Sequence, residues 1–213
     1  MIPLLHDFVG ETVLVVGGGP VGARKARTFA READVVVVSP AFDGDDFGGA
    51  ELVRAAPTPA DVAEWVDRLS PALVVAATDD AAVNDAAAEA ARDRGALVNR
   101  ADESGGRDAG SVVVPATVRD DPVVAAVATG GVAPALSAEL RRRIEGELAG
   151  AGAMAELVGE IREELKRRDV DASARRDAVR AVVSNPAVWK ALQDGDANAR
   201  EEADNVMEAG LDD

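Results

Sequence analysis

Short apolar runs alternate with amphipathic segments over residues 12–99 of this chain. Four runs have the length of strands: Thr12–Val16, Asp34–Ser39, Leu73–Ala77 and Ala96–Asn99. Three segments between them have the pattern of helices: Pro20–Arg31, the segment from Thr58 to about Leu69, and Asp80–Asp93. Apolar runs of this length are typical of strands that are buried on both faces of a parallel sheet. We therefore expect an α/β fold with a doubly wound, Rossmann-type parallel sheet.

The pattern changes after residue 100. A polar, glycine-rich loop, Asp102–Gly110, precedes two strand-like runs, Ser111–Val118 and Pro122–Thr129, which are separated by the turn-forming residues Arg119–Asp121. Two such runs joined by a short polar turn predict a β-hairpin rather than another parallel strand. A helix is expected next, from about Ala133 to Leu148, with apolar residues at every fourth position on one face: Leu136, Leu140, Ile144 and Leu148.

The rest of the chain is rich in charge and predicts three or four amphipathic helices, with Trp189 and Leu192 as buried anchors. We expect three parts: a nucleotide-binding domain over residues 1–110, a hairpin-and-helix region over residues 111–149, and a helical domain over residues 150–213. In the segment between the second and third predicted strands, residues 42–49 are expected to be irregular. Thr58 is expected to cap the helix that follows, with Asp61 in its first turn.

Composition excludes several classes of function. The chain has no cysteine, so disulfides, thiolate metal sites and a cysteine nucleophile are excluded. Its formal net charge of -16 opposes association with nucleic acid. The apolar runs are too short to cross a membrane, and the first residues lack the basic region of a secretory signal, so we expect a cytoplasmic protein. An acidic chain with only three lysines is typical of proteins that work in high salt, although an ordinary solvated acidic surface is the alternative.

The segment Gly17–Gly22 has the pattern G-x-G-x-x-G between a predicted strand and a predicted helix, which is the context of a dinucleotide-binding loop. Gly17 permits the tight turn, Gly19 lets a pyrophosphate approach the backbone, and Gly22 allows close packing of helix on strand. Pro20 and Val21 open the helix, whose N-terminal amides favour an anion. The motif predicts a nicotinamide dinucleotide as the cofactor.

The end of the second strand departs from the usual pattern. Ser39-Pro40 stands where an acidic residue normally binds the ribose hydroxyls. Asp43 or Asp45 are possible substitutes, and backbone groups of the bend at Pro40 are the alternative. No arginine cluster follows in the sequence to hold a 2′-phosphate, so NAD is favoured over NADP.

Thr78 and Asp79 end the third predicted strand, at the edge of the sheet where ligands bind. Asp79 either faces that crevice or caps the alanine-rich helix that follows. The only histidine, His6, precedes the first strand and is expected to be structural; without cysteine or a histidine cluster, no metal site is expected.

Several further motifs occur together and in order. They are Ile2-Pro3-Leu4, Ala23-Arg24-Lys25-Ala26 after the glycine loop, Ala77-Thr78-Asp79 with Val83-Asn84, Val98-Asn99 with Asp102, and Ala128-Thr129-Gly130-Gly131 followed by Ala133-Pro134-Ala135-Leu136. Together they resemble the precorrin-2 dehydrogenase family, which includes the dehydrogenase/ferrochelatase module of siroheme synthases. The resemblance covers residues 1 to about 149.

The resemblance implies NAD-dependent oxidation of precorrin-2, a tetrapyrrole, to sirohydrochlorin in sirohaem biosynthesis, with iron insertion by some members. It implies a homodimer formed through residues 111–149. The family's catalytic aspartate falls on Asp102. The implied cofactor contacts are Gly17, Gly19, Pro20, Val21, Gly22, Ser39, Pro40, Ala41, Phe42 and Thr78. The implied substrate contacts are Asn99, Arg100, Thr129, Gly130 and Gly131.

Two departures from the family pattern stand out. The loop after Asp102 is longer and richer in glycine, and Ala128-Thr129 replaces two serines, which leaves one hydroxyl. A substrate with many carboxylates also needs positive charge from an acidic chain. Arginine suits carboxylates because it binds them with two hydrogen bonds. The candidates are Arg100, Arg107, Arg119 and Arg141–Arg143, of which the last three alternatively form a solvated helix face.

Two other functions are compatible with a dinucleotide-binding domain. One is a non-catalytic nucleotide-sensing module, and the other is an NAD(P)-dependent reductase of a small metabolite. A sensing module usually has an acidic residue at the end of the second strand, where this chain has Ser39. The hairpin and the Gly130-Gly131-x-x-Pro134 segment favour the tetrapyrrole enzyme over both.

Overall fold

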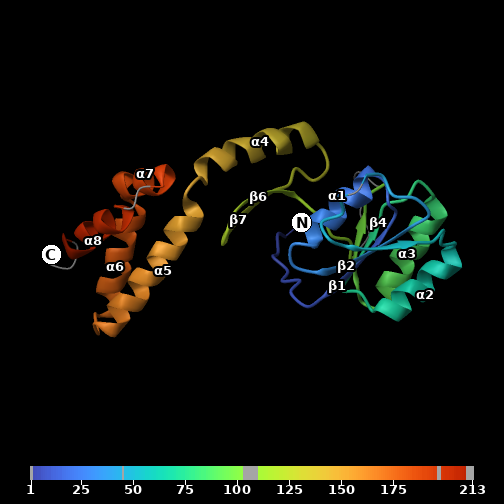
Figure 1. Ribbon diagram of the computed structural model, residues 1–213, viewed down its shortest axis with the longest axis horizontal. Helices are drawn as coiled ribbons and strands as arrows, with labels where there is room; N and C mark the ends of the chain where they lie inside the picture. The colour runs from blue at the N-terminus through green and yellow to red at the C-terminus, as the bar shows by residue number, and fades with distance from the viewer. Residues whose placement is uncertain (1, 45, 103–109, 196–197, 210–213) are drawn as a thin grey trace. The chain divides into compact units, whose positions relative to one another are not determined.

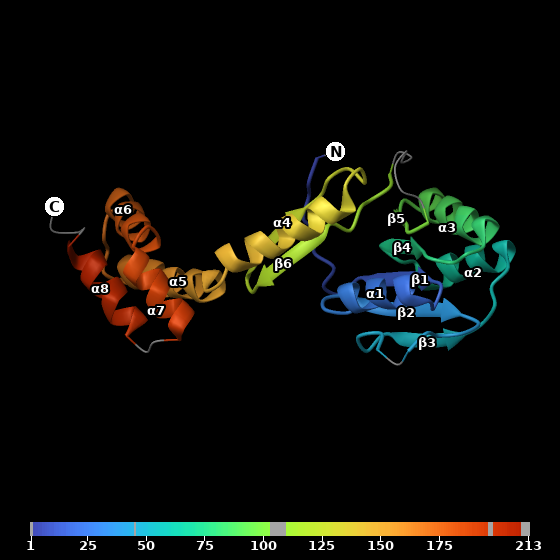
Figure 2. The same ribbon diagram turned by 90° about the horizontal axis from the view of Figure 1, so that it is seen from above.

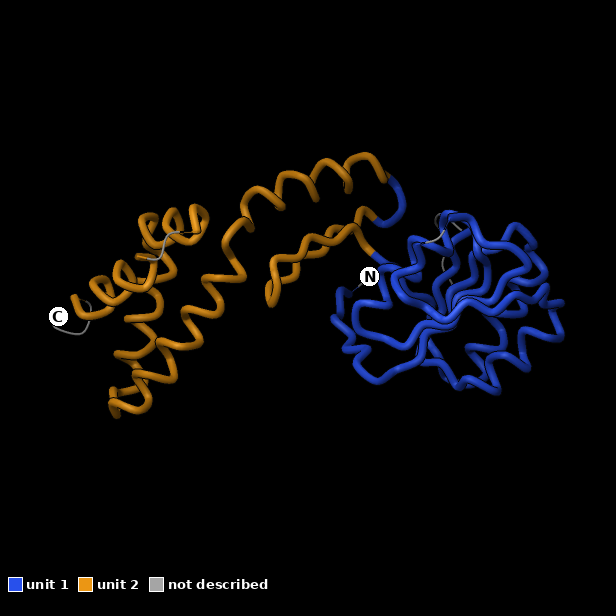
Figure 3. The backbone as a smooth tube through the Cα atoms, in the orientation of Figure 1, with its two compact units in different colours: residues 1–114, 130–132 blue, residues 115–129, 133–213 orange. Residues whose placement is uncertain are grey.

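A computed structural model of the chain describes residues 2–44, 46–102, 110–195 and 198–209. The chain divides into two compact units (Figure 3). The first contains residues 1–114 and 130–132, and the second contains residues 115–129 and 133–213. The division into three domains that the sequence predicts stays a prediction.

The first unit is built on a five-stranded parallel sheet in the order β3-β2-β1-β4-β5, as the sequence predicts for a Rossmann-type fold (Figures 1 and 2). The strands are β1 (Thr12–Val16), β2 (Asp34–Ser39), β3 (Glu51–Arg54), β4 (Leu73–Ala76) and β5 (Leu97–Arg100). In the central strand, Leu14 lies beside Val36 of β2 and Val74 of β4. Because all strands are parallel, their carboxyl ends share one edge of the sheet, which is the ligand-binding edge in this class of fold.

Strand β3 is absent from the sequence-based prediction. It pairs with β2 alone, at the edge of the sheet, and three of its four residues are exposed. An edge strand with one neighbour needs no continuous apolar run, so its sequence, Glu-Leu-Val-Arg, resembles a loop. The consequence for the site is that Arg54, at the end of β3, lies opposite Ser39 of β2.

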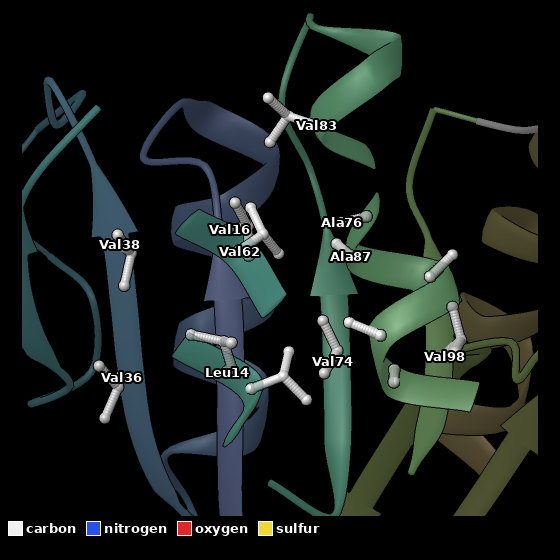
Figure 4. Close-up of a cluster of buried hydrophobic side chains, with 14 residues drawn as sticks. Leu14, Val16, Val36, Val38, Val62, Val74, Ala76, Val83, Ala87 and Val98 are labelled. Carbon is white, nitrogen blue, oxygen red and sulfur yellow. The ribbon is translucent and has the colours of Figure 1, made fainter. Parts of the chain in front are cut away.

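Helices cover both faces of the sheet. Helices α2 (Pro59–Leu69) and α3 (Ala81–Asp93) pack on one face through apolar residues that include Val62 and Ala87 (Figure 4). Helix α1 (Pro20–Phe29) packs on the other face through Ala23 and Ala26. It ends two residues before the predicted Arg31, at the C-cap Ala30.

The predicted N-terminus of α2 is confirmed. The Thr58 side chain accepts a hydrogen bond from the Asp61 amide, and the Asp61 carboxylate accepts one from the Thr58 amide at 2.8 Å. This reciprocal arrangement is a capping box, which satisfies two amides that the helix itself leaves without partners.

The second unit begins with the predicted hairpin, β6 (Ala116–Asp120) and β7 (Val123–Val127). The turn is shorter than predicted, because Arg119 and Asp120 continue the strand and pair with Val124 and Val123. The predicted first run was also too long. The backbone at Ser111 forms a bridge with Val98 of β5 instead of pairing within the hairpin.

Helix α4 (Pro134–Glu147) packs against both hairpin strands. None of its residues is buried, and Leu136 is 50% exposed in spite of the predicted apolar face. The hairpin also packs against α5 (Ala151–Arg167), where a Cβ on Gly152 would lie 2.3 Å from the Asp121 carbonyl oxygen.

Three further helices complete the unit: α6 (Ala172–Val183), α7 (Pro186–Asp194) and α8 (Ala199–Ala209). Their shared core with α5 includes Ile161, Leu165, Val182 and Met207. The predicted anchors Trp189 and Leu192 pack against this core but are only partly buried, and the Trp189 indole donates a hydrogen bond to the Val183 carbonyl at 2.7 Å. Within the described ranges, no helix has both the length and the apolarity needed to cross a membrane.

Candidate functional site

The glycine loop between β1 and α1 has no room for side chains at three of its positions. Gly17 has φ +118°, and a Cβ there would lie 2.3 Å from the Ala77 carbonyl oxygen. A Cβ on Gly22 would lie 2.0 Å from the Gly17 carbonyl oxygen, and one on Gly18 would lie 2.3 Å from the Ala41 carbonyl oxygen. These contacts hold the loop against the ends of β2 and β4.

Gly19 differs from its neighbours, because a Cβ there would meet no atom within 4 Å. Gly19 is also the N-cap of α1 and has no side chain to bond the amides of the first turn, which begins at Pro20. The loop therefore leaves open space in front of a helix N-terminus that has no side-chain cap. Unsatisfied amides and the helix dipole at such a place favour a phosphate.

The turn that follows β2 lies against this loop. The Ser39 hydroxyl is buried and donates to the Ala41 carbonyl at 2.7 Å, and the Asp43 amide donates to the Gly18 carbonyl at 2.8 Å. Arg54 donates from Nη1 to the Pro40 carbonyl at 3.0 Å, and its guanidinium carbon lies 5.4 Å from the centroid of the Phe42 ring. The predicted ribose region is thus a bend whose backbone is held by a serine and an arginine. Asp45 lies outside the described residues.

The end of β4 is held by one buried amide side chain. Asn84 of α3 accepts hydrogen bonds from the Thr78 amide at 3.1 Å and the Thr78 hydroxyl at 2.8 Å, and it donates to the Thr78 carbonyl at 2.9 Å. Asp80, and not Asp79, caps α3, because its carboxylate accepts from the amides of Ala82 and Val83. The helix begins one residue later than predicted for that reason.

Asp102, the predicted catalytic residue, follows β5 and is held by Arg100. The guanidinium donates from Nε to Asp102 Oδ1 at 3.0 Å and from Nη2 to Oδ2 at 2.8 Å, while its Nη1 donates to Asp85 of α3 at 2.7 Å. These hydrogen bonds from Arg100, with a smaller one from Asn84, lower the pKa of the Asp102 carboxyl below its usual value against the opposing effect of burial. Asp102 is therefore ionised at neutral pH.

Asn99 has an unsatisfied group near the same edge. Its side chain is 5% exposed, and its Nδ2 donates to the Val112 carbonyl at 2.8 Å. Its Oδ1 is buried and has no hydrogen-bond partner within the described structure. A buried acceptor without a partner has a free-energy cost that a donor from a ligand can remove.

Thr129, a predicted substrate contact, belongs to the second unit. Its hydroxyl donates to the Ala133 carbonyl at 3.1 Å and lies 2.9 Å from the Ser137 hydroxyl of α4. Ser137 thus supplies a second hydroxyl beside Thr129, which the sequence pattern did not indicate. The neighbouring Gly130 and Gly131 both have positive φ, +66° and +85°.

The arginines expected to bind substrate carboxylates are mostly paired with acids of the chain itself. On α4, Arg141 pairs with Glu145 at 3.3 Å, while Arg142 and Arg143 both pair with Glu139. Arg119 lies 3.8 Å from Asp121, and Arg107 lies outside the described residues. Direct binding of substrate carboxylates by these side chains would require them to exchange partners.

The fold brings most predicted residues of the first unit to the carboxyl edge of its sheet: Gly17, Gly19, Pro20, Val21, Gly22, Ser39, Pro40, Ala41, Phe42, Thr78, Asn99, Arg100 and Asp102. Sequence reasoning gave no role to Gly18, Arg54 or Asn84. Gly18, the middle residue of the Gly17–Gly19 run, could have been read as a sign of close packing, but the partners of Arg54 and Asn84 are visible only once β3 and α3 are placed. Among the described residues, no group of three or more histidine, aspartate or glutamate side chains is placed so that it could hold a metal ion.

Comparison with known proteins gives three findings. A family model described as putative NAD(P)-binding matches residues 4–116. A siroheme synthase from Chromobacterium violaceum is 36% identical over 98% of this chain, and the match covers 44% of that protein. A precorrin-2 dehydrogenase from Methanosarcina barkeri is 30% identical over 99% of this chain, and the match covers 95% of that protein.

Among solved structures, one named SirC, precorrin-2 dehydrogenase, matches with a TM-score of 0.70 at 22% identity, covering 98% of this chain and all of the other. At this identity the match shows a common fold. The chain spans about 44% of the length of the siroheme synthase from Chromobacterium violaceum, whereas it matches nearly the full length of the dehydrogenase from Methanosarcina barkeri.

Proposed function

Because the chain belongs to the precorrin-2 dehydrogenase family, we propose that it oxidises precorrin-2 to sirohydrochlorin with NAD in the biosynthesis of sirohaem. One observation carries the proposal. The glycine loop and the ionised carboxylate of Asp102 lie at the same carboxyl edge of one parallel sheet. A dinucleotide site and a fixed acid at one edge match the needs of a dehydrogenase.

The glycine loop fits NAD. Gly17, Gly18 and Gly22 have no room for a Cβ, so they form a tight cradle, while Gly19 leaves open space before the N-terminus of α1. We assign the pyrophosphate to Gly19, Pro20 and Val21, and the adenosine ribose to the bend at Ser39–Phe42. NAD supplies the acceptor for the hydride that leaves precorrin-2. Thr78, whose backbone Asn84 fixes, borders the nicotinamide side of this cradle.

The role of Asp102 follows from its partners. Oxidation of the macrocycle releases a proton as well as a hydride, and a carboxylate can accept that proton or hold a ring N–H. The bidentate bond from Arg100 lowers the pKa of Asp102, which makes it a weak base but a constant hydrogen-bond acceptor. We therefore assign Asp102 mainly to orientation of the tetrapyrrole. Its partner Arg100 positions Asp102.

We assign the remaining substrate contacts to the buried oxygen of Asn99, which lacks a hydrogen-bond partner among the described residues, and to the segment Thr129–Gly131. The buried Oδ1 of Asn99 has no partner among the described residues and would accept a hydrogen bond from the substrate. Thr129, Gly130 and Gly131 are the other proposed contacts, with the Ser137 hydroxyl beside Thr129.

Anaerobic incubation with precorrin-2 and NAD tests the activity directly, with the absorbance of sirohydrochlorin as the readout. Formation of sirohydrochlorin that depends on both NAD and the protein is the expected result. No turnover at either low or molar salt would contradict the proposal. Both conditions are needed, because a chain of net charge -16 is compatible both with work in high salt and with an ordinary solvated acidic surface.

We propose iron insertion as a second activity to be tested. The ring nitrogens of sirohydrochlorin must lose protons before they bind ferrous iron, and the ionised Asp102, whose pKa is lowered, would accept hydrogen bonds from the ring N–H groups while the protons leave to water. Ferrous iron added to sirohydrochlorin anaerobically tests this step separately. We expect Asp102→Ala to impair it, and wild-type rates in that variant would remove the residue from the reaction.

We further propose that the chain works as a homodimer in the cytoplasm. Helix α4 has apolar residues at every fourth position, yet none of its residues is buried within the chain, and Leu136 is 50% exposed. A second copy of the chain would bury this exposed apolar face in a dimer interface. Sedimentation velocity is expected to show a dimer, and Leu136→Asp is expected to shift it toward the monomer. A wild-type monomer at micromolar concentration would contradict the proposal.

A further inference from the structure

Arg54 is an exposed arginine at the carboxyl end of the edge strand β3, beside the bend Ser39–Phe42 that we assign to the adenosine ribose. It lies opposite Ser39, the last residue of β2, and the Ala55 amide donates to the Ser39 carbonyl at 3.1 Å (Figure 2). Val53 packs on the α2 and α3 face of the sheet, and successive side chains of a strand alternate between faces. Arg54 therefore lies on the same face as α1, which follows the glycine loop.

The Arg54 guanidinium is held at the bend by contacts that leave most of its donors open. Its Nη1 donates to the Pro40 carbonyl at 3.0 Å, and the guanidinium carbon lies 5.4 Å from the centroid of the Phe42 ring. A guanidinium has five N–H donors. Within the described ranges no acid pairs with Arg54, although the chain has 39 acidic residues against 23 lysines and arginines. By contrast, Arg27 of α1 is paired with Asp46 at 3.7 Å.

We propose that Arg54 binds the 2′-phosphate of NADP, so that the site accepts NADP as well as NAD. This inference rests on the proposed dinucleotide site and concerns the one phosphate by which the two cofactors differ. In Rossmann-type domains an acid at the end of the second strand binds the ribose hydroxyls of NAD, whereas a nearby arginine accommodates a 2′-phosphate. Here β2 ends in Ser39, whose hydroxyl already donates to the Ala41 carbonyl at 2.7 Å.

The placement of β3 is what changes the expectation from the sequence. The absence of an arginine cluster after β2 favours NAD, but β3 brings one arginine back to the end of β2 from further along the chain. Arginine suits this role, because its planar fork binds a phosphate through two hydrogen bonds. The contacts with Pro40 and Phe42 hold the side chain at the bend before any cofactor binds.

Asp43 is the acidic residue of the bend that would oppose this role. Its amide donates to the Gly18 carbonyl at 2.8 Å, which fixes its backbone to the glycine loop. Its side chain is exposed, so its carboxylate stays hydrated. If this carboxylate held the ribose hydroxyls, it would repel a 2′-phosphate and the site would select NAD. The experiment therefore includes Asp43→Asn.

Calorimetric titration of the full chain with NAD and with NADP, in the absence of substrate, tests the inference. At low salt we expect the Kd for NADP to lie within about tenfold of the Kd for NAD, because an exposed charge contact is modest in strength. Arg54→Gln should weaken NADP binding by about tenfold to thirtyfold and NAD binding by only about threefold, because only NADP loses a charge-assisted hydrogen bond. Arg68→Gln is the matched control and should change neither affinity, since Arg68 lies over Trp65 on α2.

Two further measurements separate charge from general damage. Arg54→Glu reverses the charge and should weaken NADP binding by about a hundredfold or more, because like charges repel, with a much smaller effect on NAD. Molar salt should reduce the effect of Arg54→Gln on NADP binding, since salt screens an exposed contact. Thermal unfolding should be close to that of the wild type in both variants, because the side chain is exposed on an edge strand.

Three results would overturn the inference. The first is a wild-type Kd for NADP more than about a hundredfold above that for NAD. The second is an equal loss of NAD and NADP binding in Arg54→Gln. The third is an Asp43→Asn variant that loses NAD affinity and gains NADP affinity, because Asp43 would then select NAD. The titrations contain no precorrin-2, so absent turnover beside intact NADP binding would contradict the proposed function alone. Normal turnover with NAD beside absent NADP binding would contradict this inference alone.

Discussion

The two ends of the sheet edge in the first unit are built in opposite ways. At the glycine-loop end, the structure depends on residues without side chains. Gly17, Gly18 and Gly22 let backbone segments approach one another so closely that a Cβ would not fit. At the Asp102 end, a side chain holds the carboxylate in place, through the two hydrogen bonds that Arg100 donates to Asp102. The glycine-loop end therefore depends on close packing, and the Asp102 end depends on charged hydrogen bonds. Substitutions in the glycine loop should change stability and NAD affinity, whereas substitutions at Asp102 should change the reaction rate.

The largest effect is expected from Gly17→Ala. The added Cβ would lie 2.3 Å from the Ala77 carbonyl, and φ +118° is strained for any side chain. We expect a loss of stability of at least about 2–4 kcal/mol together with loss of NAD binding. Chemical denaturation and calorimetry measure the two.

Gly19→Ala is the matched control for that variant. Its Cβ would meet nothing within 4 Å, so the free energy of unfolding should change by less than about 1 kcal/mol. NAD binding should still weaken by about tenfold or more, because the methyl group enters the space assigned to the pyrophosphate. An unchanged affinity of this variant for NAD would contradict the assignment of the pyrophosphate to the space beside Gly19.

At the other end, Asp102→Asn should act on rate and not on cofactor affinity. We expect the single-turnover rate to fall by about tenfold to a hundredfold with the Kd for NAD unchanged within about twofold. Because the pKa of Asp102 is lowered, this carboxylate should stay ionised down to below the usual range of an aspartate. The wild-type rate should therefore show no titration of Asp102 between pH 5 and 8, and a titration there that Asp102→Asn removes would contradict the assignment.

A smaller effect is expected from Arg54→Gln at the ribose bend. Arg54 fixes the Pro40 carbonyl at 3.0 Å and lies over Phe42, but it is exposed. We expect NAD binding to weaken by about threefold, because an exposed contact of this kind contributes under about 1 kcal/mol. Arg68, whose guanidinium lies over Trp65 on α2, offers a matched substitution that should leave NAD binding unchanged. If the substitutions of Arg54 and Arg68 weakened NAD binding equally, Arg54 would have no specific role at the ribose bend.

The smallest effect concerns Lys25 on α1, the one group of the loop end whose pKa falls near neutrality. Burial, with a contribution from Arg24, lowers the pKa of Lys25 to about 8. Between that value and the ordinary value near 10.5, the unfolded chain binds more protons than the folded chain, so stability should rise with pH. Below pH 8 the full cost of burying the charge is present.

Lys25→Met should therefore be more stable than the wild type at pH 7, by about 1 kcal/mol, since the amine keeps part of its contact with water. The difference should vanish as the pH approaches 10.5. Thermal unfolding of both proteins from pH 7 to 10 measures it, with the exposed Lys190→Met as control. A wild type whose stability does not rise over this range would refute the assignment.

The same contrast explains what the sequence could and could not predict. The loop end was predictable, because the valine-rich strands, the spacing of Gly17–Gly22 and the cap at Thr58 are local signals. The edge strand β3 carries no continuous apolar run, so Arg54 could not be assigned to the ribose bend. At the Asp102 end, the aspartate was assigned from its position after the last predicted parallel strand together with the family resemblance.

The hydrogen bonds at the ends of β4 and β5 are a property of the fold. Thr78 and Asn84 come from separate segments, and no spacing rule predicts that the Asn84 amide holds the Thr78 backbone. Arg100 shows the same limit. The sequence predicted a group that binds substrate, whereas the structure gives it Asp85 and Asp102 as partners.

The central claim is that this sheet edge transfers a hydride from precorrin-2 to NAD. The most direct measurement is the ratio of NADH to sirohydrochlorin formed under anaerobic conditions by wild-type protein and by Gly19→Ala. We predict one NADH for each sirohydrochlorin with the wild type, and strongly reduced formation of both with Gly19→Ala at limiting NAD. Sirohydrochlorin formed without NADH, or formed equally well by both proteins at limiting NAD, would contradict the account.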